Sequence, residues 1–221
     1  MARALDAVRV LASADEIGLV DVARRLDLPA STTHRLLATL SAQGWVAQNP
    51  RTGRYRISRR VLWLAAQLHE RTAPLRATAR PYLERARKVS GAVAQLAVLE
   101  DAEVVYLEEI CPPAAAAVPA GRTAPAHAAA AGKVLLAQVA PDRLAILRSP
   151  HEYERRTART ITTPAALERE LEAIRRRGYA VDDEEDAAGV AAVAAAVVTA
   201  TGAPVAAVGI AGAAAVVTAT G

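Results

Sequence analysis

Residues 28–40 read LPASTTHRLLATL, a stretch with the spacing of an amphipathic helix. Pro29 suits the first position of this helix, because proline lacks only an N–H that would be unpaired there. Positions i, i+3, i+4 and i+7 form one face, made of Thr33, Leu36, Leu37 and Leu40. We expect this face to meet a core, and Ser31, Thr32, Arg35 and Thr39 to point outward. Gly44 is expected to end the helix.

Two helices are predicted before this stretch and a β-hairpin after it. Apolar residues recur at helical spacing in residues 5–12 and again in residues 19–26. Residues 45–48 and 54–57 are strand-like runs on either side of residues 49–53, whose Asn, Pro and Gly favour a turn. Helices followed by such a hairpin predict a winged helix-turn-helix.

Basic residues are concentrated in this first part of the chain. The formal net charge is +4 overall, but between Asp27 and Glu70 there are arginines and no acidic residue. Such a field favours phosphate backbones, so double-stranded DNA is the expected partner. A solvated helix face would explain the helix alone, but not a basic hairpin beside it. The expected DNA contacts are Ser31, Thr32, Thr33, His34, Arg35 and Thr39 on the helix and Arg51, Thr52, Arg54 and Arg56 on the hairpin.

The rest of the chain predicts a mixture of helices and strands. Apolar runs at residues 92–99 and 104–110, with an acidic turn between them, indicate a second hairpin. Ala73-Pro74 is expected to break the chain, and a Pro-bearing loop is expected from Cys111 to Pro125. Helices are expected over residues 59–69, 75–89, 127–139, 142–148 and 164–177, the last with Thr163 as its cap and Gly178 at its end.

Residues 187–221 carry no charge and are long enough to span a membrane. Glycines and Pro204 interrupt them, so we interpret the segment as two buried strands joined by a turn at residues 201–204, and we expect no membrane partner. Cys111 is the only cysteine, and the N-terminal residues form no secretory apolar run. A cytoplasmic location is therefore expected.

The sequence shows no complete catalytic or metal-binding pattern. Gly132-Lys133 lacks the rest of a P-loop, and the four histidines share no ligand spacing. No serine lies in a Gly-x-Ser-x-Gly turn, and Cys111 has no neighbouring base. His127 is expected to be a cap or a packed residue. The acidic run Asp182–Asp186 is interpreted as a solvated turn, with a metal site as the less favoured alternative. We expect no enzymatic activity and no cofactor.

Several motifs together resemble the IclR family of transcriptional regulators. They are LVDVARR at 19–25, LPASTTHRLL at 28–37, GWV at 44–46, TGRY at 52–55, VYL at 105–107, PAHA at 125–128, GKVLLA at 132–137 and RRRGYAVDDEE at 175–185. The resemblance implies an α+β fold with three parts: a winged helix-turn-helix over 1–60, a linker helix over 61–73, and a GAF-like α/β effector-binding domain with an antiparallel sheet over 74–221. Asp27 stands where family members usually have a turn glycine, and Ala30 stands where they often have lysine. These two departures are expected to affect DNA affinity rather than the fold.

The resemblance further implies a regulator that binds a pseudo-palindromic operator as a homodimer, with a tetramer left open, and responds to a small organic acid. Carried over by position, the effector-binding residues are Ala130, Ala131, Asp182, Val190, Ala192, Gly209 and Ala211. Family members often have Cys at the position of Ala192 and Ser near Gly209 and Ala211. Their absence favours a more apolar or aromatic effector, or a weak response. Plain strand packing is the alternative for these residues, and an effector-blind architectural DNA-binding protein is the alternative function.

Overall fold

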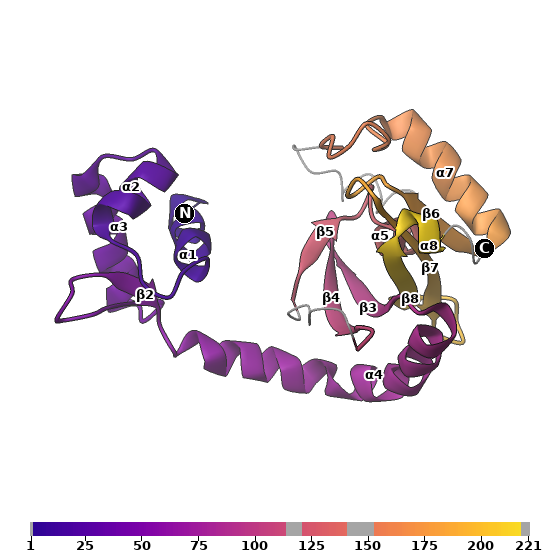
Figure 1. Cartoon of the computed structure of the whole chain (residues 1–221), viewed down its shortest axis with the longest axis horizontal. Helices are drawn as coiled ribbons and strands as arrows, with labels where there is room; N and C mark the ends of the chain where they lie inside the picture. The colour runs from indigo at the N-terminus through magenta and orange to yellow at the C-terminus, as the bar shows by residue number, and fades with distance from the viewer. Residues whose placement is uncertain (1, 114–120, 141–152, 218–221) are drawn as a thin grey trace. The chain divides into compact units, whose positions relative to one another are not determined.

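The computed structural model describes residues 2–113, 121–140 and 153–217 (Figure 1). The chain divides into two compact units, with the boundary between Arg71 and Thr72. Each unit has its own apolar core. The helix expected over residues 142–148 lies outside the described residues.

The N-terminal unit contains the expected three helices and hairpin. Helices α1 (Ala2–Ala12), α2 (Leu19–Leu26) and α3 (Ala30–Ala42) precede strands β1 (Val46–Gln48) and β2 (Tyr55–Ile57), which pair antiparallel. Ile17 adds a short bridge to Tyr55 beside β2. The core consists of Ala7, Leu11, Ile17, Val22, Leu26, Leu37, Leu40, Val46 and Tyr55. The predicted winged helix-turn-helix is confirmed.

The turn between α2 and α3 contains the aspartate that replaces the family's glycine. Asp27 adopts a left-handed conformation, with φ 52° and ψ 52°. Aspartate is among the few residues other than glycine that adopt this region, because its short polar side chain can hydrogen-bond locally. The Leu28 N–H donates to the Ala23 carbonyl at 3.0 Å and closes α2. The turn therefore forms without glycine.

A single helix, α4 (Val61–Ser90), replaces the two helices expected around residues 73–74. The prediction that Ala73-Pro74 ends the linker helix was therefore wrong, since Pro74 lies inside α4. A proline within a helix costs about 3 kcal/mol, because one backbone hydrogen bond is lost. Beyond Pro74 the helix buries Ala79 and Leu83 against the sheet of the second unit. Full burial of a leucine contributes roughly 1.5–3 kcal/mol, so packing on the sheet helps to sustain a helix that contains both Pro74 and Pro81.

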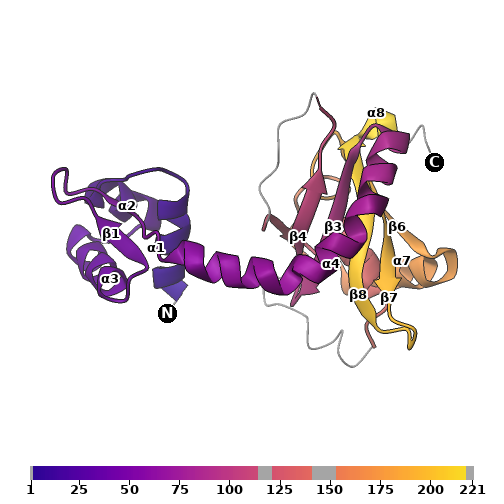
Figure 2. The same cartoon turned by 90° about the horizontal axis from the view of Figure 1, so that it is seen from below.

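The second unit is built on a six-stranded antiparallel sheet in the order β5-β4-β3-β8-β7-β6 (Figures 1 and 2). Its strands are β3 (Val93–Glu100), β4 (Glu103–Ile110), β5 (Thr123–Pro125), β6 (Tyr179–Asp183), β7 (Val190–Val198) and β8 (Pro204–Ala213). The predicted hairpin is β3–β4, paired from Glu100↔Glu103 onward. The uncharged C-terminal segment forms β7 and β8, as predicted, followed by α8 (Ala214–Val217).

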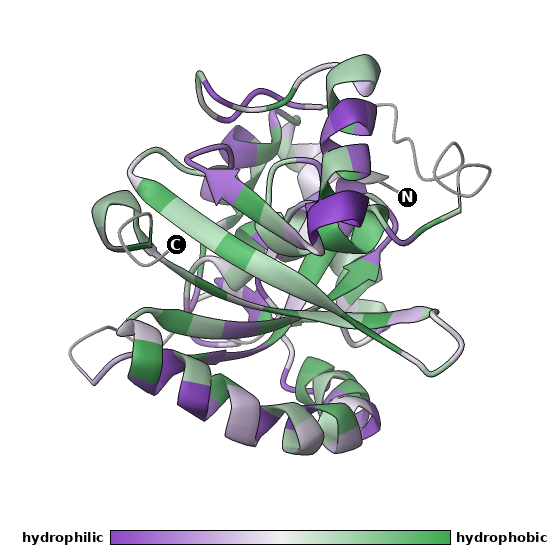
Figure 3. Cartoon of the chain, turned by 90° about the vertical axis from the view of Figure 1, so that its right-hand side faces the viewer, coloured by the Kyte–Doolittle hydropathy of each residue, from purple (hydrophilic) through white to green (hydrophobic). Residues whose placement is uncertain are grey.

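Helices cover both faces of this sheet (Figure 3). The part of α4 after Pro74 packs on one face, against Ala94, Leu96 and Ala206. On the other face lie α5 (Ala130–Leu136) and α7 (Pro164–Arg177), whose apolar residues share a core with the strands. The Thr163 hydroxyl accepts the Ala166 N–H at 3.3 Å, and Gly178 ends α7 with a φ of 84°, so both predicted ends are confirmed.

Helix α5 is shorter than the predicted helix over 127–139, because residues 127–129 form a turn before it. Within the part of the chain that the structure describes, no helix combines the length and apolar character required to cross a bilayer.

Candidate functional site

The outer face of α3 has the composition that its spacing predicted. Leu37 and Leu40 are buried in the core of the N-terminal unit, and Leu36 is half-buried. Exposed side chains on the same helix are Ser31, Thr32, His34, Arg35 and Thr39. The Thr39 hydroxyl donates to the Arg35 carbonyl at 3.0 Å. The helix therefore presents one basic and hydroxyl-bearing surface, which we call the α3 face.

Thr33 is the one predicted contact on α3 that the structure removes from this surface. Its side chain is fully buried, and its hydroxyl donates to the Pro29 carbonyl at 3.1 Å. A side chain in the core cannot reach a base or a phosphate without unfolding the helix. Including Thr33 among the DNA contacts was therefore wrong, although its expected position on the core side of α3 is confirmed.

The hairpin begins directly after α3 and carries the other predicted contacts. Trp45 N–H donates to the Leu40 carbonyl at 2.9 Å, which ties the start of the hairpin to the end of α3. Arg51, Thr52 and Arg54 are exposed, and Arg56 is half-buried. Asn49 closes the turn, because its side-chain Oδ1 accepts the N–H groups of Arg51 at 2.9 Å and Thr52 at 3.3 Å.

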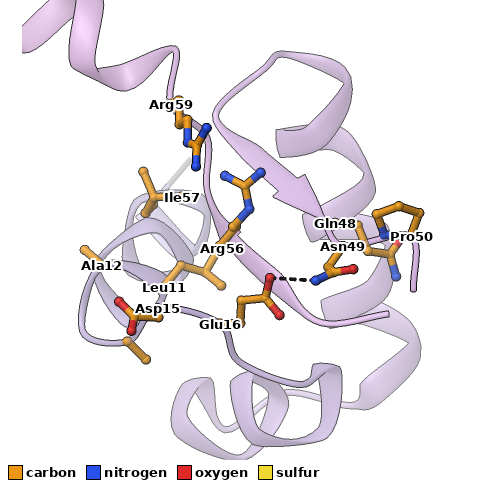
Figure 4. A pocket seen from close by; sticks show the side chains of 11 residues that line it. Leu11, Ala12, Asp15, Glu16, Gln48, Asn49, Pro50, Arg56, Ile57 and Arg59 are labelled. Atoms are coloured by element: carbon orange, nitrogen blue, oxygen red, sulfur yellow. Dashed lines mark hydrogen bonds between the residues drawn. The ribbon is translucent and has the colours of Figure 1, made fainter. Parts of the chain in front are cut away.

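A pocket of about 660 Å³ lies between the end of α1 and the inner side of the hairpin (Figure 4). Asp15 and Glu16 from the α1–α2 loop line this pocket together with Asn49, Arg56 and Arg59. The Glu16 carboxylate accepts the Asn49 side-chain N–H at 2.8 Å. Sequence reasoning missed Glu16, since no spacing rule connects a loop acid to a turn more than thirty residues later.

The carried-over effector residues lie in two groups in the second unit. Ala130 and Ala131 are buried at the start of α5, which packs on β6, β7 and β8. Asp182, Ala192 and Ala211 are cross-strand neighbours in one row, with Asp182 paired to Ala192 and Ala192 to Ala211. Gly209 lies two residues before Ala211 on β8, and Val190, at the start of β7, is 38% exposed.

Gly209 has a structural reason to lack a side chain. A Cβ placed there would lie 2.5 Å from the Val193 carbonyl oxygen and 3.1 Å from the Ala194 Cβ. A serine at this position would require β7 and β8 to move apart. Strand packing therefore accounts for the missing polar group at Gly209.

Polar side chains that the sequence analysis did not select lie beside Gly209 on the α5 side of the sheet. Gln95 pairs with Gly209 across β3 and β8, and its side-chain amide donates to the Glu109 Oε1 at 2.7 Å. Arg122 also donates to this oxygen, at 3.1 Å, and its guanidinium lies 3.9 Å from the centre of the Tyr106 ring. Only 2% of the Glu109 side chain is exposed, and its Oε2 has no hydrogen-bond partner among the described residues.

Gln95, Tyr106, Glu109 and Arg122 form a group that we call the β3–β5 polar cluster, and the pKa values of two of its members, Tyr106 and Arg122, are shifted. Burial raises the pKa of the Tyr106 hydroxyl. Burial acts to lower the pKa of Arg122, but its contacts with Glu109 and Tyr106 outweigh this effect and raise it. Arg122 is therefore a fixed cation next to a carboxylate that can accept one more hydrogen bond. Gln95 is a polar residue within the apolar run of residues 92–99, and this was the signal in the sequence that could have revealed the cluster.

The acidic run Asp182–Asp186 begins in the last two residues of β6, and it is only in part the solvated turn that was expected, since Asp183 is exposed. Asp182 and Glu185 are buried, and the Asp182 Oδ1 accepts the Glu185 N–H at 2.7 Å. Burial raises the pKa of Asp182 to about 6 and also raises that of Glu185. Lys133 on α5 donates to Glu185, so buried charge is compensated by a partner.

His127 is packed, as predicted, with its ring edge-on to Tyr153 at 5.4 Å between centroids. Its Nε2 lies 3.2 Å from the Glu154 carbonyl oxygen, and burial lowers the pKa of the imidazole. Among residues 2–113, 121–140 and 153–217, no three His, Cys, Asp or Glu side chains gather as a metal site.

Comparison with known proteins gives a family match in each of the two units. The IclR helix-turn-helix domain matches residues 1–50, and the C-terminal domain of bacterial IclR transcriptional regulators matches residues 67–221. The chain belongs to the IclR family. It is 35% identical to the HTH-type transcriptional regulator BhcR of Paracoccus denitrificans over 195 residues, which cover 87% of this chain and 70% of that protein.

Two further comparisons support membership of the IclR family. The transcriptional repressor IclR of Escherichia coli is 32% identical over 200 residues, which cover 89% of this chain and 73% of the repressor. A solved structure of an IclR homologue from Microbacterium hydrocarbonoxydans, in complex with 4-hydroxybenzoate, has 28% identity and a TM-score of 0.71 and covers 96% of this chain and 88% of its own. The protein is therefore a DNA-binding transcriptional regulator with an effector-binding C-terminal domain, and not an enzyme.

Proposed function

We propose that this IclR-family regulator recognises operator DNA with the α3 face, and that the hairpin binds the same DNA beside it. The observation that carries the proposal is the division of α3 into a buried apolar side and an exposed side bearing Arg35. An exposed arginine on a helix can pair bidentately with guanine in the major groove, and short hydroxyl side chains allow close approach to phosphates. On the hairpin, Arg51 at the tip, Arg54 directly before β2 and Arg56 on β2 supply positive charge next to this helix.

The test begins with selection of duplexes from a random-sequence pool by the full-length protein, followed by gel-shift titration of the selected duplex. We expect Arg35→Ala to lose most of the sequence-specific affinity, by about 10-fold or more, because one bidentate base contact contributes about 1–3 kcal/mol. Arg176→Ala is the matched control, since it removes the same charge from an exposed position on α7 in the other unit. The proposal fails if Arg35→Ala and Arg176→Ala bind as tightly as wild type.

The protein is proposed to act as a homodimer on a pseudo-palindromic site. Support comes from the start of α4, where Leu62 and Trp63 are 68% and 65% exposed and Leu64 and Leu68 are also exposed. Clustered exposed apolar side chains are unusual on a monomer and are typical of a protein interface. A two-fold dimer would present two α3 faces to two half-sites, so the selected duplexes should contain inverted repeats. We propose that this occurs in the cytoplasm.

The effector is proposed to be a small organic acid bound on the α5 side of the sheet. The carried-over residues there are mostly alanines, which suits an apolar or aromatic body, while the β3–β5 polar cluster supplies a cation and an acceptor. The homologue with bound 4-hydroxybenzoate supports this class of compound. A thermal-shift screen of aromatic and aliphatic acids, with 4-hydroxybenzoate included, should raise the melting temperature with at least one acid.

An effector-blind architectural DNA-binding protein is the competing function, favoured by the missing polar groups at Ala192 and Ala211. No acid would then change either the melting temperature or the affinity for the selected duplex. A compound that raises the melting temperature and shifts the gel-shift midpoint excludes this alternative.

A further inference from the structure

Glu16 fastens the loop before α2 to the tip of the hairpin. Its Oε1 accepts the Asn49 side-chain N–H at 2.8 Å, and its Oε2 accepts the Thr52 hydroxyl at 3.3 Å. Its backbone carbonyl accepts an N–H of the Arg54 guanidinium at 3.1 Å. One residue therefore holds three hairpin side chains, two of them predicted DNA contacts (Figure 4 shows the bond to Asn49).

The bond to Asn49 determines the shape of the tip. Because Asn49 donates through its Nδ2 to Glu16, its Oδ1 is directed to the backbone N–H groups of Arg51 and Thr52. The Gly53 N–H donates to the Asn49 carbonyl at 2.8 Å and completes the turn. Loss of the Glu16 carboxylate would free the Asn49 amide to rotate, and the tip would then sample several conformations.

The negative charge of Glu16 also has an electrostatic effect, which opposes DNA binding. Its carboxylate lies beside a basic hairpin, where a negative charge repels phosphates. Asp15, the adjacent residue, places an exposed carboxylate at the same pocket, and within the part of the chain that the structure describes no hydrogen bond joins it to the hairpin tip. If charge alone mattered, removal of either acid would tighten DNA binding.

We propose that Glu16 is a positioning residue for DNA binding. It holds the hairpin tip in the conformation that presents Arg51 and Thr52 to the duplex, and this preorganisation outweighs the repulsion of its own charge. The inference rests on the proposed DNA-binding function of the α3 face and hairpin. It predicts that removal of Glu16 weakens DNA binding, whereas removal of the neighbouring Asp15, which carries the same charge, does not.

The experiment compares full-length Glu16→Ala, Glu16→Gln and Asp15→Ala with wild type, by gel-shift titration of the selected duplex at several salt concentrations. We expect Glu16→Ala to weaken binding by about 3- to 10-fold, since ordering freed side chains opposes association. Glu16→Gln keeps an acceptor for Asn49 and should stay within about 2-fold of wild type. Asp15→Ala should bind as tightly as wild type or more tightly.

The salt dependence separates positioning from a general loss of folding. A mobile tip loses phosphate contacts, so the slope of log affinity against log salt should become shallower in Glu16→Ala by about one unit per lost contact. A smaller folded fraction would lower the affinity with the slope unchanged, and that result would overturn the proposal. Trp45 and Trp63 are the tryptophans of the chain, so their fluorescence reports the folding of the N-terminal region directly.

Arg35→Ala, measured in parallel, separates the two proposals. If Arg35→Ala loses binding and Glu16→Ala binds as wild type or more tightly, the role of Glu16 is refuted while the DNA-binding surface stands. If Arg35→Ala also binds as wild type, the proposed surface itself fails.

Discussion

Lys133 on α5 and Glu185 in the turn after β6 form a buried ion pair in the second unit. Lys133 is fully buried, and in the part of the chain that the structure describes the second carboxylate oxygen of Glu185 has no hydrogen-bond partner. The pair joins the helix to the segment that carries Asp182, one of the proposed effector residues. Gly132-Lys133 thus has a structural role, not the phosphate-binding role that such a dipeptide has in a P-loop.

Removal of one member of this pair should be costly. Lys133→Met leaves the Glu185 carboxylate buried without its cation, and we expect the free energy of unfolding to fall by about 3–5 kcal/mol. The double variant Lys133→Met/Glu185→Leu removes both charges and should lie closer to wild type than Lys133→Met does. Urea unfolding followed by circular dichroism measures all the variants in a double-mutant cycle. Additive effects of the two single substitutions would contradict the coupling.

Asp182 should make the stability of the protein depend on pH. Burial raises its pKa from 3.8 to about 6, so between these values the native state holds a proton that the unfolded state releases. Stability from this group is therefore highest below pH 4, falls as the pH rises to about 6, and then levels off. Asp182→Asn should match wild type at pH 4 and exceed it at pH 8 by up to about 3 kcal/mol, at about 1.4 kcal/mol per pKa unit. Thermal unfolding across this range measures it, and equal differences at both pH values would refute it.

Gly132 should not accept alanine, although alanine usually stabilises a helix. A Cβ at Gly132 would lie 2.3 Å from the backbone of Ala126, which α5 approaches closely. We expect Gly132→Ala to lower the free energy of unfolding by roughly 1–3 kcal/mol or more through overpacking. Gly91→Ala is the control, since its Cβ would meet nothing within 4 Å and only its φ of 68° opposes the change. A smaller loss of unfolding free energy in Gly132→Ala than in Gly91→Ala would argue against the close approach of α5 to Ala126.

Trp63 should contribute to the proposed dimer. Trp63→Glu places a charge among exposed apolar side chains at the start of α4, and we expect the dissociation constant of the dimer to rise by about 10-fold or more. Tyr82, which is 70% exposed later on the same helix, provides the matched control Tyr82→Glu. Sedimentation equilibrium measures both variants. An unchanged dimer in Trp63→Glu, or an equal loss in Tyr82→Glu, would remove the start of α4 from the interface.

The local spacing of residues was sufficient to predict the structure wherever contacts between neighbours along the chain decide it. The repeat of Leu37 and Leu40 identified the buried side of α3 and hence the exposed Arg35. Thr163 and Gly178 marked both ends of α7, because a cap is an interaction within one helical turn. The same kind of reasoning failed at Pro74, where packing of the following turns on the sheet sustains a helix that proline alone would interrupt.

The amino-acid sequence by itself determined the family, the helices and hairpin of the N-terminal unit, and the side of α3 that faces outward, since all of these depend on patterns within short segments. Only the tertiary structure placed Glu16 against Asn49, Gln95 against Glu109, and Lys133 against Glu185. These contacts join residues 14 to 52 positions apart, and their polar atoms meet because separate elements pack together and exclude water. Hydrogen bonds and ion pairs of this kind leave no periodic signal, so they become visible only once the chain is folded.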